Sequence, residues 1–277
     1  MRPLLALATL IAGRRRGGPA GLPAGTHVEG DLAYGPDPAQ RLDVYLPGRP
    51  PTGPIVVMVH GGAWAMGDKA GPAVIGHKVA HWLPMGVIVV SVNYRLLPRA
   101  EPLEQAGDVA RALAFVQAHA AAWGADASRL VLMGHSTGAH LVALLTADDT
   151  LASAEGATRW LATILLDSAA LDVVRLMRGP HMRLHDRAFG PVPEYWRQAS
   201  PMHRLQDVPV PMLLVHSSER RDSQEQGQRF AAAVAAKGGR AEVLAVALTH
   251  VEINALLGDD ADYTVKVDAF LRSVGCL

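Results

Sequence analysis

The sequence has a single cysteine, Cys276, among its 277 residues. A disulfide within the chain is therefore impossible, and a cysteine-rich metal site is excluded. The chain also lacks an excess of charge of either sign, because 26 Lys and Arg residues balance 26 Asp and Glu residues. Without a basic stripe, the composition indicates no nucleic-acid partner. Cys276 itself is expected to be an inert terminal residue.

No apolar run near the N-terminus is long enough to cross a bilayer, so no stable membrane span is expected. The run at residues 3–12 resembles the apolar core of a signal peptide, but the arginines at residues 14–16 lie on its wrong side. No clear Ala-x-Ala cleavage site follows. We therefore interpret residues 1–25 as a flexible or targeting segment. Both a cytoplasmic and an exported location stay open.

The rest of the chain, residues 26–277, alternates short apolar runs with stretches of helical periodicity. Unbroken β-branched runs such as residues 55–60 are typical of strands buried on both faces of a parallel sheet. The predicted strands are residues 40–46, 55–60, 87–93, 130–133, 160–166 (ending at Asp167), 212–216 and 242–246. The predicted helices are residues 74–84, 103–123, 139–146, 224–237 and 261–274. This alternation predicts one α/β domain with a mostly parallel central sheet and helices on both faces.

One stretch combines a strand, a very tight turn and a helix. It contains Gly134-His135-Ser136-Thr137-Gly138, the Gly-x-Ser-x-Gly pattern of a nucleophile elbow. Side chains at the two glycines would collide with neighbouring backbone, whereas glycine has no Cβ. Ser136 is left at the tip of the turn, at a helix N-terminus that favours developing negative charge. The pattern predicts that Ser136 is a nucleophile.

A serine nucleophile needs a base and a carboxylate that orients the base. In the elbow fold these groups follow in the order serine, acid, histidine. His250 is the only histidine after His216 and follows the last predicted strand, so it is the candidate base. The acid is expected after the strand that ends at His216. Asp222 is preferred there, although it could also cap the next helix, and Glu219 is the alternative.

The negative oxygen of a tetrahedral intermediate needs backbone N–H donors. One donor is expected to be Thr137, the residue after the nucleophile. The others are assigned to Gly62 and Ala63, in the loop after the strand at residues 55–60, with Gly61 shaping the turn. The proline-rich insertion at residues 172–209 is expected to form one wall of the pocket. No metal and no organic cofactor is implied.

Four motifs together resemble the α/β-hydrolase fold: residues 60–64 (His-Gly-Gly-Ala-Trp), residues 93–96 (Asn-Tyr-Arg-Leu), the elbow, and residues 249–250 (Thr-His). More narrowly, they are similar to esterases of the hormone-sensitive-lipase and feruloyl-esterase/arylformamidase-like branch, from about residue 30 to the end. The resemblance implies the same nucleophile, base and oxyanion donors, and gives Tyr94-Arg95 a structural role. Two departures are Ala63, where many relatives have a third glycine, and Thr137, where alanine is frequent.

The expected function is a serine carboxylesterase that hydrolyses small to medium carboxylic esters through an acyl-enzyme intermediate. An arylformamidase or amidase would use the same triad and is the alternative. A non-catalytic binding protein on the same fold is the alternative of another class. The sequence does not fix the oligomeric state.

Overall fold

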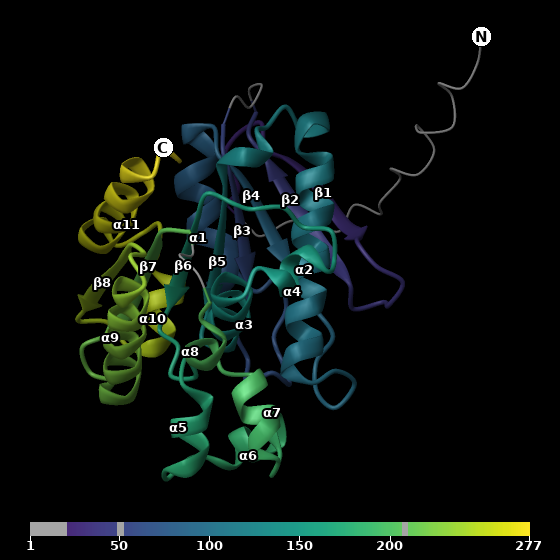
Figure 1. Cartoon of the computed structure of the whole chain (residues 1–277). Helices are drawn as coiled ribbons and strands as arrows, with labels where there is room; N and C mark the ends of the chain where they lie inside the picture. Colours follow the sequence, from purple (N-terminus) through teal and green to yellow (C-terminus); the bar gives the residue numbers. More distant parts are fainter. Residues whose placement is uncertain (1–20, 49–52, 207–209) are drawn as a thin grey trace.

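The computed structural model describes residues 21–48, 53–206 and 210–277. Its centre is an eight-stranded sheet in the order β1-β2-β4-β3-β5-β6-β7-β8 (Figure 1). The first two strands run antiparallel to their neighbours, and all later pairings are parallel. The strands are β1 (His27–Ala33), β2 (Arg41–Leu46), β3 (Ile55–Val59), β4 (Ile88–Val92), β5 (Leu130–His135), β6 (Ala162–Leu166), β7 (Met212–Ser217) and β8 (Ala241–Val246). The predicted mostly parallel sheet is confirmed.

Helices cover both faces of this sheet because successive side chains of a strand point to opposite sides. In β3, Val57 and Val59 pack into one core with the buried residues of α2 (Pro102–His119), α3 (Thr137–Ala147) and α9 (Arg221–Ala236). Val56 and Met58 pack into a second core with α1 (Pro72–Trp82), α10 (His250–Ala255) and α11 (Ala261–Ser273). Every residue of β3 is buried, as its unbroken β-branched sequence predicted.

No helix or strand was predicted in the insertion at residues 172–209, but its described residues contain four short helices. They are α5 (Val173–Arg178), α6 (Arg183–Phe189), α7 (Pro193–Gln198) and α8 (Pro201–Arg204). Figure 1 shows α5, α6 and α7 projecting together from one end of the sheet. Prolines open α7 and α8, where the missing N–H costs no helical hydrogen bond.

The sequence patterns also missed the strand β1 and the helix α10. The remaining short elements are α4 (Thr150–Ser153) and three 3₁₀ turns, at Leu83–Met85, Ala120–Trp123 and Ala127–Arg129. Within the described ranges, no helix has both the length and the apolar character needed to cross a membrane. The predicted N-terminal segment lies outside the described residues up to residue 20.

Candidate active site

Ser136 lies at the turn between β5 and α3, in a backbone conformation that few residues adopt (φ 55°, ψ −116°). The two elbow glycines make this turn possible. A Cβ on Gly134 would lie 2.4 Å from the carbonyl oxygen of Gly138, and a Cβ on Gly138 would lie 2.3 Å from that of Val59. The Ser136 N–H donates to the Leu166 carbonyl at 2.8 Å, which ties the turn to β6. The predicted steric reason for both glycines is therefore confirmed.

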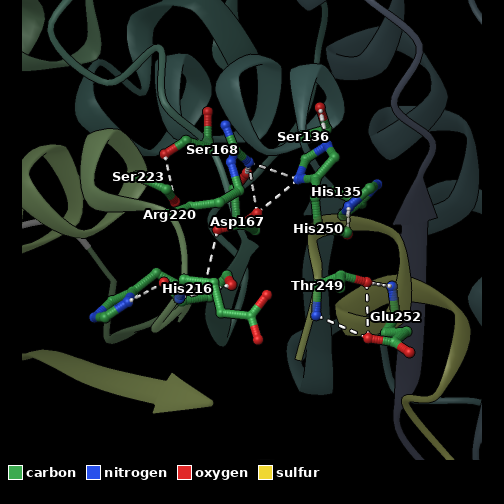
Figure 2. Close-up of polar contacts among 12 residues, drawn as sticks. His135, Ser136, Asp167, Ser168, His216, Arg220, Ser223, Thr249, His250 and Glu252 are labelled. Carbon is green, nitrogen blue, oxygen red and sulfur yellow. Dashed lines mark hydrogen bonds and ion pairs between the residues drawn. The ribbon is translucent and has the colours of Figure 1, made fainter. Parts of the chain in front are cut away.

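Three side chains form a continuous chain of hydrogen bonds at this turn (Figure 2). Nε2 of His250 lies 3.0 Å from Oγ of Ser136, and Nδ1 lies 2.6 Å from Oδ2 of Asp167. The structure thus brings Ser136 and His250 together, as the sequence predicted. Their carboxylate partner, Asp167, is the residue that directly follows β6.

The prediction that Asp222 is the carboxylate partner of His250 was wrong. Asp222 lies inside the first turn of α9, its side chain is 59% exposed, and it bonds Arg220 instead. Glu219, the alternative, is also exposed. The physical reason is which side chains the strand ends present to His250. Asp167 directly follows β6, the neighbour of β5, and contacts Nδ1 of His250. The segment after β7 also reaches His250, but it presents Arg220 there, and Asp222 bonds Arg220 from the exposed start of α9. The order serine, acid, histidine is preserved.

The Asp167 carboxylate is fully buried and held from several sides. Its Oδ1 accepts the Ser217 N–H at 3.0 Å, and its Oδ2 also accepts Nη1 of Arg220 at 2.6 Å. Burial alone would raise the pKa of Asp167, but these hydrogen bonds, led by that from His250, and the Arg220 charge hold it well below its usual value. Asp167 is therefore an anion at neutral pH, as a residue that orients a histidine must be.

His250 is placed by α10, which it opens. The sequence from Thr249 to Glu252 forms a capping box: Oγ1 of Thr249 accepts the Glu252 N–H, and Glu252 accepts the Thr249 N–H at 2.9 Å (Figure 2). His135, in β5, lies against the imidazole with ring centroids 4.6 Å apart. Its Nε2 lies 2.9 Å from the His250 carbonyl oxygen, to which it donates. Burial lowers the pKa of His135 to about 3, so this ring is a neutral support.

The other histidine in the elbow region, His140, takes no part in the catalytic chain. It is fully buried on α3, where Nδ1 accepts the Trp64 indole N–H at 3.2 Å and Nε2 donates to the Ala199 carbonyl at 2.7 Å. Burial lowers its pKa to about 4. His140 therefore connects the oxyanion loop (residues 61–64) to the helical insertion and is not bonded to Ser136 Oγ.

The predicted oxyanion residues all lie around Ser136. Gly62, Ala63 and Thr137 line the same cavity as Ser136, and no acceptor is found for their backbone N–H groups among the described residues. Gly62 and Ala63 both have positive φ, 135° and 53°, and so does the next residue, Trp64, at 58°. This strained loop is anchored by the fully buried Trp64, whose carbonyl accepts the Gln105 amide at 2.9 Å. Strain of this kind is found where a backbone is shaped for function.

The cavity above Ser136 measures about 580 Å³ and has a mainly apolar lining. Its walls include the oxyanion loop and some residues of the insertion. The prediction that residues 172–209 form a wall of the pocket is therefore confirmed for those lining residues. Met182, Leu184 and His185 are the lining residues from the insertion. Met66 and Met182 are largely exposed for methionines, at 64% and 58%, so apolar surface faces solvent beside the cavity.

Tyr94 and Arg95 have the structural role that the resemblance implied. The Tyr94 hydroxyl donates to the His60 carbonyl at 2.8 Å, and the Arg95 guanidinium binds the buried Asp108 carboxylate through two nitrogens. Neither residue lines the cavity. Within the described ranges, no group of three or more potential side-chain ligands is placed to hold a metal ion.

The sheet order, the elbow and the serine–histidine–aspartate chain together define the α/β-hydrolase fold with a serine-hydrolase type of site. The chain belongs to the BD-FAE family, whose profile matches residues 42–232.

Two curated relatives illustrate the similarity within the sequence. Isoprenylcysteine alpha-carbonyl methylesterase ICME of Arabidopsis thaliana is 30% identical over 246 residues, which are 82% of this chain and 57% of the relative. Esterase LipC of Mycobacterium tuberculosis is 31% identical over 206 residues, 68% of this chain and 50% of that protein. The chain thus spans about half the length of these two relatives.

Solved structures confirm the fold. Thermogutta terrifontis esterase 2 in its apo form superposes with a TM-score of 0.72 at 24% identity, over 92% of this chain and 96% of that one. Esterase B from Lactobacillus rhamnosis has a TM-score of 0.72 at 19% identity, over 91% and 86% of the two chains.

Proposed function

We propose that this protein is a serine carboxylic-ester hydrolase. The single observation that carries the proposal is the hydrogen-bonded chain from Ser136 through His250 to Asp167, set beside backbone N–H groups that have no acceptor among the described residues. The family and the names of the relatives, a methylesterase and an esterase, support the same reaction class. The apolar cavity of about 580 Å³ suits small to medium ester substrates.

In the proposed mechanism His250 takes the Ser136 proton through Nε2 while the serine oxygen attacks the ester carbonyl. Asp167 keeps the proton on Nδ1 and stabilises the imidazolium that forms. The carbonyl oxygen becomes an oxyanion, which accepts hydrogen bonds from the N–H groups of Thr137 and of Gly62 or Ala63. One such donor is worth about 3–4 kcal/mol of the barrier.

His250 then gives its proton to the leaving alcohol, which departs as the acyl–Ser136 ester forms. In the second half, His250 activates a water molecule that attacks the acyl carbonyl. The carboxylic acid is released when the proton returns to Ser136. In each half of the reaction, His250 thus acts first as a base and then as an acid.

The test is the variant Ser136→Ala, assayed on p-nitrophenyl esters of graded acyl length. We expect kcat/KM to fall by at least about 10³-fold while the unfolding temperature stays unchanged, because only a hydroxyl is removed. In the unmodified protein, a fluorophosphonate probe should label Ser136. Retained activity in the variant would contradict the proposal.

The same assays distinguish the alternative functions. Faster turnover of N-formyl aromatic amides than of any ester would favour an arylformamidase. A protein that neither reacts with the probe nor hydrolyses any of these substrates would be a binding protein.

A further inference from the structure

Arg220 occupies the place where the sequence led us to expect the acid. It lies in the turn between β7 and α9, as the N-cap residue of α9, and its side chain extends toward the catalytic histidine (Figure 2). Its Nη1 lies 2.6 Å from Oδ2 of Asp167 and 2.7 Å from Nδ1 of His250. Its Nη2 lies 3.2 Å from Oδ2 of Asp222. One guanidinium thus contacts two members of the triad and is only 27% exposed.

The chemistry of these contacts assigns the protons. A guanidinium only donates and keeps its charge at every relevant pH. A histidine that serves Ser136 as a base must carry its proton on Nδ1, which then donates to Asp167. Nδ1 cannot at the same time accept from Arg220. The guanidinium therefore bonds the Asp167 carboxylate, and beside His250 it acts as an adjacent positive charge.

The other groups around His250 leave Arg220 as its nearest cation. From β5, His135 is neutral because burial lowers its pKa to about 3. From α1, Lys78 bonds the Asn254 carbonyl at 2.5 Å and its side-chain oxygen at 2.9 Å. From α10 itself, Glu252 bonds Thr249. From α11, burial raises the pKa of the Tyr263 phenol, which is uncharged. Asp167 supplies the only anion in contact with the imidazole among the described residues.

We propose that Arg220 is a positioning residue of the triad: it holds the Asp167 carboxylate against His250, and it places a positive charge 2.7 Å from Nδ1 of the imidazole. The proposal rests on the proposed hydrolase function. Arg220 has two opposed effects. It fixes the orientation of the acid, which aids catalysis, and its adjacent positive charge opposes formation of the imidazolium.

The experiment compares Arg220→Gln and Arg220→Lys in the full chain through the pH profile of kcat/KM on a p-nitrophenyl ester. Glutamine removes the charge, so we expect the acidic limb to move upward by about one pH unit. Lysine keeps the charge but loses the planar fork, so we expect the limb to stay near the wild-type position while kcat falls several-fold. The matched control is Arg221→Gln, because Arg221 is 88% exposed and, in the described part of the chain, forms an ion pair only with Glu225. This control should change neither the position of the acidic limb nor kcat.

A second readout is independent of ester hydrolysis. The Nδ1 proton of His250 bonded to Asp167 should give a low-field proton resonance, and its titration midpoint should move upward in Arg220→Gln and not in Arg220→Lys. An unmoved limb and midpoint in Arg220→Gln would overturn the proposal, and so would an equal shift in both variants. If the wild type hydrolyses no ester, the proposed function fails, while the resonance still decides the role of Arg220.

Discussion

At the scale of single residues, the site depends on buried charged and polar groups that neighbouring protein groups hold in place. Asp167 is the clearest example, since a buried carboxylate is stable as an anion only when donors and a cation surround it. Lys78 is the opposite case, because burial favours its uncharged form. It is fully buried, its two hydrogen bonds both run to Asn254, and burial lowers its pKa to about 7. Lys78 thereby fastens α1 to α10, the helix that carries His250.

This lowered pKa has a consequence for stability. In the unfolded chain the pKa of Lys78 has its normal value of 10.5. Between about pH 7 and about pH 10.5, the unfolded chain therefore binds one more proton than the folded chain. The contribution of Lys78 to the free energy of unfolding should therefore rise with pH across this window. Urea unfolding at pH 7 and at about pH 9 should show this rise in the wild type and a smaller rise in Lys78→Met. Equal pH dependence in both proteins would contradict the assignment.

At the scale of elements, short segments at strand ends carry the functional groups, and local caps hold these segments in place. The six-residue helix α10 is too short to be stable on its own. It is fixed by the Thr249–Glu252 capping box, by His135 and by Lys78. The position of the base thus depends on contacts outside the catalytic chain.

The capping box gives a test at this scale. Thr249→Ala removes the N-cap of α10 and should cost about 1 kcal/mol of stability. It should also lower kcat, because a small displacement of His250 weakens proton transfer from Ser136. The matched control is Asp260→Ala, which removes the N-cap of α11, where Asp260 accepts the Tyr263 N–H at 2.9 Å. A similar loss of stability with unchanged kcat is expected for the control. Equal effects on kcat would show that α10 has no special role.

At the scale of the whole molecule, the sheet order gathers groups from four strand ends at one place. The end of β3 supplies the oxyanion loop, β5 the nucleophile, β6 the acid and the segment after β8 the base. Since β5 lies between β3 and β6, the nucleophile has the oxyanion loop on one side and Asp167 on the other. This is the crevice at the carboxyl ends of the strands in which open α/β sheets bind ligands.

Local patterns predicted most of this arrangement. The buried strands were found because they are unbroken β-branched runs, and Ser136 was found because the elbow needs both glycines. The edge strand β1 was missed because its residues are partly exposed and include Gly30 and Asp31, which are poor strand formers. The helix α10 was missed although Thr249-x-x-Glu252 is a recognisable capping box.

The acid could not be predicted from local pattern, because its identity depends on which carboxylate at the strand ends reaches His250 in the assembled fold. Two aspartates follow neighbouring strands: Asp167 comes directly after β6, and Asp222 comes a few residues after β7, in the first turn of α9. Only the assembled sheet shows that Asp167 reaches His250 and that Arg220 occupies the position after β7 where the acid was expected.

The most direct test of this account is the comparison of Asp167→Asn with Asp222→Asn in kcat for a p-nitrophenyl ester. Asp167→Asn should lower kcat by about 10³–10⁴-fold, because asparagine no longer holds the proton on Nδ1 or stabilises the imidazolium. Asp222→Asn should change kcat by less than about twofold, because Asp222 is exposed and away from His250. A large loss in Asp222→Asn with near-normal activity in Asp167→Asn would contradict the account.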